Sequence, residues 1–122
     1  MYAERYVIPV TTASDGSATV YSPVFTGAIK TLRYVKTDFA DGVDFTITLE
    51  GTGEGVWAES NVNAAKTVAP RQPIHDLVGV ASLYAALGEG VETEIIAVKD
   101  RLKIIIAQGG NAKTGAFHLT AG

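Results

Sequence analysis

The stretch VDFTITLE, residues 43–50, decides the fold class of this chain. Its odd-numbered positions are apolar and its even-numbered positions are polar. A period of two puts successive side chains on opposite faces of a β-strand. The segment RLKIII, residues 101–106, shows the same alternation at Leu102, Ile104 and Ile106. Both stretches predict strands of an antiparallel sheet that packs one face on a core and exposes the other to water.

Similar short runs extend in both directions, separated by glycine, proline and Asp-Gly turn signals about every 8–12 residues, a spacing typical of a sandwich or jelly roll. We therefore predict an all-β fold, an antiparallel β-sandwich or jelly roll of about eight strands, with residues 1–122 forming a single domain. The apolar residues of the run at 29–36 break strict alternation, and a bulge near Thr31 would explain the break. Strands are expected at residues 4–12, 18–25, 29–36, 43–50, 56–60, 91–98, 101–108 and 116–120, with a further short strand within 61–68.

The apolar sides of the strongest runs predict the buried core. An alternating strand stabilises a sheet when the residues on its apolar side are buried away from water. The expected core residues are Ile8, Val20, Leu32, Phe45, Ile47, Leu49, Ile95, Leu102, Ile104 and Ile106.

Turn chemistry adds detail to this outline. Gly16 and Gly42 each follow an aspartate between strand-like runs, which predicts a hairpin turn with positive φ at the glycine. Pro9 and Pro23 cannot donate to a ladder, so the strands that hold them are expected at sheet edges or bulges.

The passage DLVGVASLYAAL, residues 76–87, allows two interpretations. Asp76 could cap a short helix. One face of that helix would hold Leu77, Ala81, Tyr84 and Ala85. A long surface loop over the sandwich is the alternative, and Gly79 favours it. Both alternatives remain open at the level of sequence.

Composition excludes several classes of protein. The chain has no cysteine, so it has no disulfide and no thiolate metal site. Its formal net charge is −3, and its basic residues form no block, so we expect no nucleic-acid partner. No stretch approaches the roughly 20 apolar residues of a membrane span, and no signal peptide is expected at the N-terminus.

The best candidate metal ligands are Asp38, Asp41 and Asp44, because calcium prefers several oxygen ligands from one loop. Their spacing does not match an EF-hand loop, and an aspartate before glycine is more simply a turn residue. We therefore predict no metal site.

The candidate catalytic residues are His75, beside Asp76, and His118 in the last strand. No Gly-x-Ser-x-Gly elbow accompanies them, and His118 is expected to face solvent between buried neighbours. The glycine clusters 51–55 and 109–111 lack the Gly-Lys-Ser/Thr of a phosphate-binding loop and are interpreted as hairpin turns. We predict no catalytic residue, no cofactor and no enzymatic activity.

The aromatic residues could serve either of two purposes. They could form a platform on which sugars stack, or they could pack across strands and at protein interfaces, which is the favoured interpretation. They are Tyr2, Tyr6, Tyr21, Tyr34, Tyr84 and Trp57.

Three parts of the chain resemble a family of small virion proteins of tailed bacteriophages. They are ERYVIPVTT with DGSATVYSPV (4–12 and 15–24), LRYVKTDFADGVDFTITLEGTGE (32–54) and RLKIIIAQGGNAKTGAFHL (101–119). The resemblance implies a structural, head-associated protein of the decoration or cement type. Such a protein would be assembled into the virion in the host cytoplasm and would contact the major capsid protein or neighbouring virion proteins.

Several alternatives accompany this expectation. Within the same class, the chain could be a neck or tail accessory protein, or an adaptor. From other classes, it could be a carbohydrate-binding module that aids adsorption to the host, or a small hydrolase. We also expect a homo-oligomer, because exposed strand edges and the segment Met1–Ala3 could contact a neighbouring copy.

Overall fold

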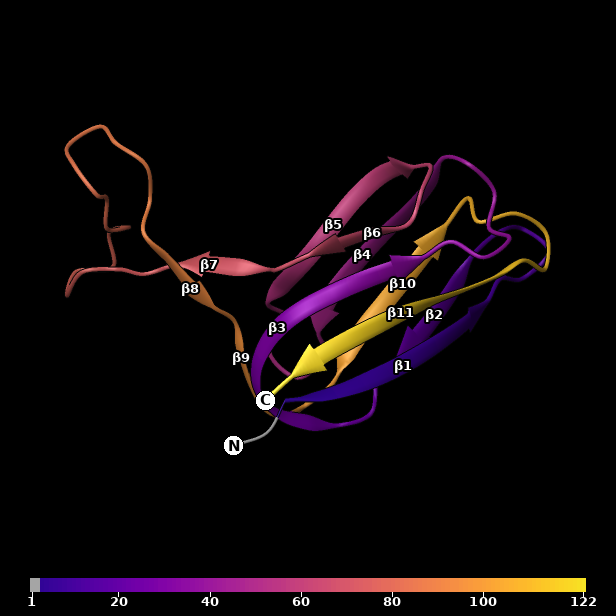
Figure 1. Ribbon diagram of the computed structural model, residues 1–122, viewed down its shortest axis with the longest axis horizontal. Coiled ribbons are helices and arrows are strands. Elements are labelled where there is room, and N and C mark those ends of the chain that lie inside the picture. Colours follow the sequence, from indigo (N-terminus) through magenta and orange to yellow (C-terminus); the bar gives the residue numbers. More distant parts are fainter. Residues whose placement is uncertain (1–2) are drawn as a thin grey trace.

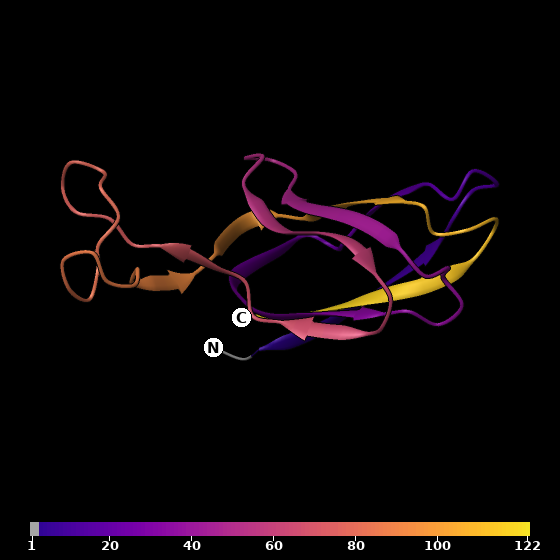
Figure 2. The same ribbon diagram turned by 90° about the horizontal axis from the view of Figure 1, so that it is seen from above.

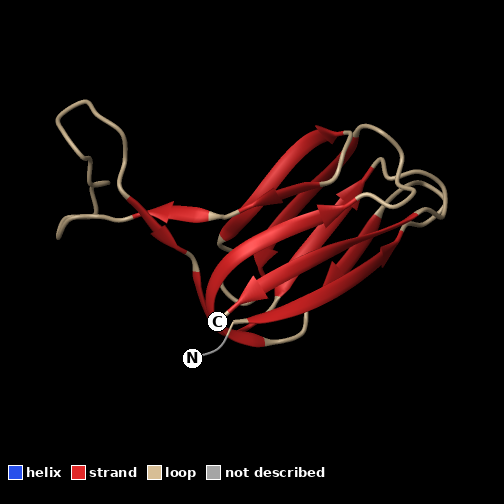
Figure 3. Ribbon diagram, viewed as in Figure 1, coloured by secondary structure: helices blue, strands red, loops and turns tan. Residues whose placement is uncertain are grey.

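The computed structural model describes residues 3–122, and within them the chain forms strands, turns and loops without a helix (Figure 3). The predicted all-β class is confirmed. The strands are β1 (Glu4–Thr11), β2 (Ala18–Tyr21), β3 (Phe25–Val35), β4 (Val43–Leu49), β5 (Gly55–Val62), β6 (Lys66–Val68), β7 (Arg71–Pro73), β8 (Glu92–Glu94), β9 (Ile96–Asp100), β10 (Leu102–Ala107) and β11 (Thr114–Ala121).

Two antiparallel sheets pack against each other as a sandwich (Figures 1 and 2). One is five-stranded, in the order β1-β11-β3-β6, with β9 also paired to β3. The other is four-stranded, in the order β2-β10-β4-β5. The isoleucine-rich strand β10 is central in its sheet, and β11 is central in the opposite sheet. The edge position of β1 agrees with Pro9, whereas Pro23 lies between β2 and β3 because the strand expected at 18–25 ends at Tyr21.

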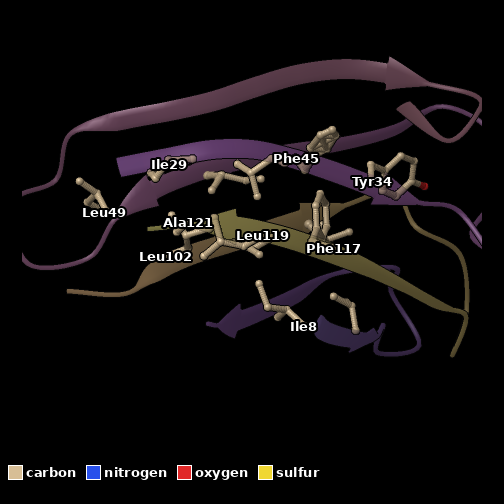
Figure 4. Packing of buried hydrophobic residues seen from close by; sticks show 14 of the residues in the cluster. Ile8, Ile29, Tyr34, Phe45, Leu49, Leu102, Phe117, Leu119 and Ala121 are labelled. Carbon is tan, nitrogen blue, oxygen red and sulfur yellow. The ribbon is translucent and has the colours of Figure 1, made fainter. Parts of the chain in front are cut away.

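The core lies between the inner faces of the two sheets (Figure 4). Every predicted core residue is buried except Val20, which is half-buried because β2 is a short edge strand. At one end of the core Tyr34, Phe45 and Phe117 contact one another, with ring centroids 5.2–5.4 Å apart. Inward positions on β1, β4, β10 and β11 alternate with outward ones, as the period of two predicts.

The predicted hairpins at Gly16 and Gly42 are wrong, although both glycines have the predicted positive φ, +84° in each case. The turn at Gly16 joins β1 to β2, and the turn at Gly42 joins β3 to β4, and each pair of strands lies in different sheets. Asp-Gly sets the local backbone but does not determine which strand pairs with which. Residues 109–111 likewise link the two sheets, whereas residues 51–55 close a true hairpin between β4 and β5.

Strand limits differ from the prediction where a strand changes partners. β3 begins at Phe25, earlier than expected, and the predicted bulge is present. Thr120 of β11 is opposite Thr31 of β3, but the next residue of β11, Ala121, is opposite Ile29. Lys30 is therefore the extra residue of the bulge. The run predicted at 91–98 divides at the buried Ile95, because β8 pairs with β7 and β9 pairs with β3.

Residues 71–94 form an arm that projects from the sandwich, at the end where both termini lie (Figures 1 and 2). β7 and β8 pair at its base, and isolated bridges His75↔Ala81 and Leu83↔Gly90 continue towards its tip. The helix alternative for 76–87 is therefore wrong, and the loop does not lie over the sandwich. Positive φ at Gly79 (+81°) and Leu87 (+59°) bends the chain out of helical geometry.

Candidate functional site

The arm exposes most of its apolar side chains. Leu77 and Leu87 are fully exposed, and Val78 and Tyr84 are 82% and 78% exposed. Single exposed apolar residues are ordinary on a protein surface, but a contiguous group marks a site of interaction. The exposed apolar residues of the arm are Ile74, Leu77, Val78, Val80, Leu83, Tyr84 and Leu87.

Backbone hydrogen bonds hold the arm in shape, so its side chains are left to face outward. Ser82 donates its N–H to the carbonyl of Ile74, and Val91 donates to the carbonyl of Ser82, each at 2.9 Å. The carboxylate of Asp76 accepts the N–H groups of Val78 and Val80 at 3.0 Å, which closes the tip as a turn. This is the capping chemistry that the sequence predicts for Asp76, used at a turn instead of a helix.

The base of the arm is tied to the sandwich, and the arm is acidic. Lys30 of β3 donates to the carboxylate of Glu94 at 3.0 Å. Only Arg71 offsets the carboxylates of the arm, so the arm alone carries a formal charge of −3, equal to that of the whole chain. The rest of the molecule is formally neutral. The acidic residues of the arm are Asp76, Glu89, Glu92 and Glu94.

An apolar groove of about 480 Å³ runs between the edge strands β1 and β2. The prolines on its rim carry no N–H, so a partner would contact this edge through side chains more than through a strand ladder. Val7, at the centre of β1, is 55% exposed. The groove is lined by Val7, Ile8, Pro9, Val20, Tyr21 and Pro23.

A cationic hollow of about 410 Å³ lies on the outer face of the five-stranded sheet. His118 on β11 is directly opposite Arg33 on β3, and Arg5 on β1 is opposite Thr120. The guanidinium of Arg33 donates to the hydroxyl of Thr67 at 2.8 Å. The lining residues are Arg5, Thr31, Arg33, Thr67, His118 and Thr120, which include no carboxylate.

The groove and the cationic hollow are adjacent. Val7 lines the groove and is also the register partner of His118, which lines the hollow. An apolar strip and a basic strip therefore share the β1 edge of the sandwich.

The three aspartates proposed as metal ligands are used separately. Asp38 accepts both the N–H and the hydroxyl of Thr114, and these bonds lower the pKa of Asp38. Asp41 pairs with Lys36. Asp44 accepts the N–H of Asn61 at 2.9 Å. Across residues 3–122, no group of three or more histidine or acidic side chains is placed to hold a metal ion.

The two histidines lie in different parts of the molecule. His75 is exposed on the arm, and His118 is half-buried on the outer face of β11, with Phe117 and Leu119 pointing into the core as predicted. In the described part of the chain, neither histidine is hydrogen-bonded or ion-paired to a side chain that could orient it as a base.

The aromatic residues do not gather on one surface. Tyr34 is buried in the core, and Tyr6 packs near Phe25 with ring centroids 6.0 Å apart. The guanidinium of Arg101 lies 4.0 Å from the ring centre of Tyr21, a cation–π contact. Trp57 packs edge-on against Phe45, and Tyr84 lies on the arm, whereas Tyr2 is outside the described residues.

The sequence predicts that partner contacts vary within residues 61–89, but it does not predict that residues 71–94 project as an arm. The signal was present, because residues 74–87 are apolar but follow neither a period of two nor a reliable helical period. A run of this kind that cannot join a sheet or a helix is a candidate for exposure. Within residues 3–122, no helix has the length and apolar character needed to cross a membrane. Comparison with family models, curated proteins and solved structures finds no match for this chain.

Proposed function

We propose that this chain is a non-enzymatic structural protein of a tailed-bacteriophage virion, a decoration or cement protein that stabilises the head. The observation that carries the proposal is the arm, with its exposed apolar side chains held by a backbone scaffold on a well-packed sandwich. Such a surface promotes association unless another protein covers it. A particle built from many copies supplies that cover, through the major capsid protein, neighbouring virion proteins or other copies of the chain.

The test is binding to purified heads that lack the protein. We expect saturable co-sedimentation with many copies per head, and greater resistance of the loaded heads to heat. A variant with serine at Leu77 and Leu87 should fold normally and bind heads weakly. Failure of the native protein to sediment with heads, at any ratio, would contradict the proposal. A low copy number confined to the neck or tail would instead indicate the accessory or adaptor role.

A second candidate function is carbohydrate binding. A hollow of about 220 Å³ lies beside Trp57 on β4 and β5, where Thr46 and Thr48 add polar groups. The indole N–H of Trp57 donates to Glu59 at 3.0 Å, which fixes the ring. Binding of host cell-wall glycans by the native protein, lost in Trp57→Ala, would support this function over the first.

A further inference from the structure

We infer that the arm of one copy docks on the β1 edge of a second copy. Its apolar tip would occupy the groove between β1 and β2, and its carboxylates would face the cationic hollow. The inference concerns association in solution and does not depend on the role in the virion proposed above.

Apolar complementarity is the first argument. The arm presents leucine, valine and tyrosine side chains that range from 47% to fully exposed, and the groove is lined by aliphatic, proline and tyrosine side chains. Both surfaces would leave water on docking, which is the main favourable term in most protein association. The arm projects from the sandwich, so its tip can reach the groove of a second copy (Figure 1).

Charge complementarity is the second argument. Glu89 and Glu92 make no ion pair among residues 3–122 and lie on an arm of net charge −3. Arg5 and Arg33 lie in a hollow with no carboxylate in its lining. The sandwich without the arm is formally neutral. Its positive charge is therefore concentrated locally at the hollow, on the outer face of one sheet. Opposite potentials on two adjoining strips fix the orientation of docking as well as favouring it.

The placement of the two surfaces makes the contact intermolecular. The arm leaves the end of the sandwich where the termini lie and points away from β1 and β2 (Figures 1 and 2). A copy therefore cannot fill its own groove. Each copy gives one arm and receives another. The exchange is either reciprocal between two copies, which closes a dimer, or heterologous, which produces a larger ring or an open chain.

Sedimentation velocity tests the inference, at protomer concentrations from about 1 to about 100 μM, where interfaces of moderate affinity become populated. We expect the native protein to form oligomers over this range. The arm variant Leu77→Ser with Leu87→Ser, and the groove variant Val7→Glu, should each remain monomeric while melting as native. Ile105→Ser is the matched control, because Ile105 is 43% exposed on the outer face of the other sheet and should leave association unchanged.

Mixing the two defective variants gives the sharper result. The arm variant keeps its groove and the groove variant keeps its arm, so together they should form a 1:1 heterodimer and nothing larger. Charge reversal provides a second check: Arg5→Glu should weaken association at least about tenfold, and more at low salt than at high salt.

Three outcomes would overturn the inference. A groove variant that associates like the native protein would indicate arm-to-arm contact. A mixture that stays monomeric would exclude the arm-to-groove pair. A native protein that is monomeric at the highest concentration would show that the arm does not bind a second copy.

Discussion

The hydroxyl of Tyr34 is the one side-chain polar atom in the described chain that is buried without a hydrogen-bond partner. Burial raises the pKa of Tyr34 to about 12, and the nearby Asp41 carboxylate adds to the shift. The ring is fully buried and packs against Phe39, Phe45 and Phe117. The aromatic carbons therefore contribute to the core, whereas the hydroxyl oxygen has no hydrogen-bond partner. An unpaired buried hydroxyl costs free energy of folding.

Tyr34→Phe is therefore expected to leave the free energy of unfolding unchanged or to raise it by about 1 kcal/mol. The gain should grow above about pH 10, because the unfolded tyrosine ionises there while the folded one stays neutral until its pKa of about 12. Urea unfolding at pH 7 and at alkaline pH measures both effects. Tyr21→Phe is the control, since its ring is 39% exposed and should show no stabilisation. A clear loss of stability in Tyr34→Phe would mean that the hydroxyl has a partner.

Asp38 holds the start of the β3–β4 corner to β11 by accepting the N–H and hydroxyl of Thr114. These hydrogen bonds favour the charged carboxylate and lower its pKa in the folded state. A lowered folded pKa stabilises the protein above the unfolded value of about 4, and this stabilisation is lost as the pH falls through the folded pKa.

Asp38→Ala should consequently lower the melting temperature at pH 7, and the difference from the native protein should shrink as the pH falls below about 4. Thermal unfolding followed by circular dichroism over this pH range measures the difference. Asp76→Ala is a suitable comparison, because that carboxylate lies on the exposed arm and should affect the sandwich little. A difference that stays constant with pH would contradict the assigned role of the charge.

At the scale of elements, the sequence predicts the strands well and their partners poorly. The alternation in β4 and β10 determines which side chains are buried, and the structure confirms it. The glycines at 16 and 42 indicate turns, but the same positive φ serves a hairpin and a corner between sheets. Partner choice depends on contacts between strands far apart in sequence, such as β1 with β11, which no local pattern records.

The corner at Gly16 gives a test of this distinction. An added Cβ there would lie 3.0 Å from the N atom of Gly110 and 3.2 Å from that of Gly109, whereas one at Gly53, in the β4–β5 hairpin, meets nothing within 4 Å. Both glycines have positive φ, +84° and +77°. We expect Gly53→Ala to cost about 1 kcal/mol for backbone strain alone, and Gly16→Ala to cost clearly more. Chemical denaturation compares the two, and equal losses would show that the Gly16 corner can relax.

The sequence marks residues 74–87 as apolar without a regular period, but the projecting conformation of the arm could not be predicted, because it depends on which surfaces of the molecule the segment packs on. Residues 74–87 have enough apolar residues for a core helix, but Gly79 and the positive φ at Leu87 divide them into turns. Asp76 offered a genuine helix cap, and its side chain does bond to following N–H groups. The carboxylate of Asp76 caps a turn and not the helix that was one of the two interpretations, because the segment projects from the sandwich and has no surface to pack on as a helix.

Excision of residues 74–91, the part of the arm beyond β7 and β8, tests the independence of the arm from the sandwich. Pro73 and Glu92 are register partners, so replacing residues 74–91 with Asn-Gly should close β7 and β8 as a tight hairpin. Because the removed side chains are almost all exposed, we expect the free energy of unfolding to change by no more than about 0.5 kcal/mol. For comparison, Leu102→Ala in the core should cost about 2–5 kcal/mol. If removing the arm lowers the free energy of unfolding by as much as Leu102→Ala does, the arm supports the sandwich.

At the scale of the whole molecule, packing and recognition are divided between two regions. The sandwich buries its apolar residues between two sheets, and the arm exposes apolar residues and carries the whole formal net charge of −3. The fold follows from alternation and turn spacing, which are properties of single strands. The arm, the groove and the cationic hollow depend on the assembled surface, and Arg5, Arg33 and His118 are adjacent only because β1, β3 and β11 pair.

If copies associate through the arm and the groove, the stability of the molecule should depend on its concentration. Binding that favours the folded state adds free energy in proportion to the logarithm of partner concentration, up to about 1.4 kcal/mol for each tenfold rise. For a domain of this size that corresponds to a rise of a few degrees in melting temperature. Scanning calorimetry of the native protein should show this rise, and the arm-excised protein should melt at one temperature at every concentration. A native melting temperature that does not change with concentration would mean that the folded copies gain no stability from one another, which would contradict association through the arm and the groove.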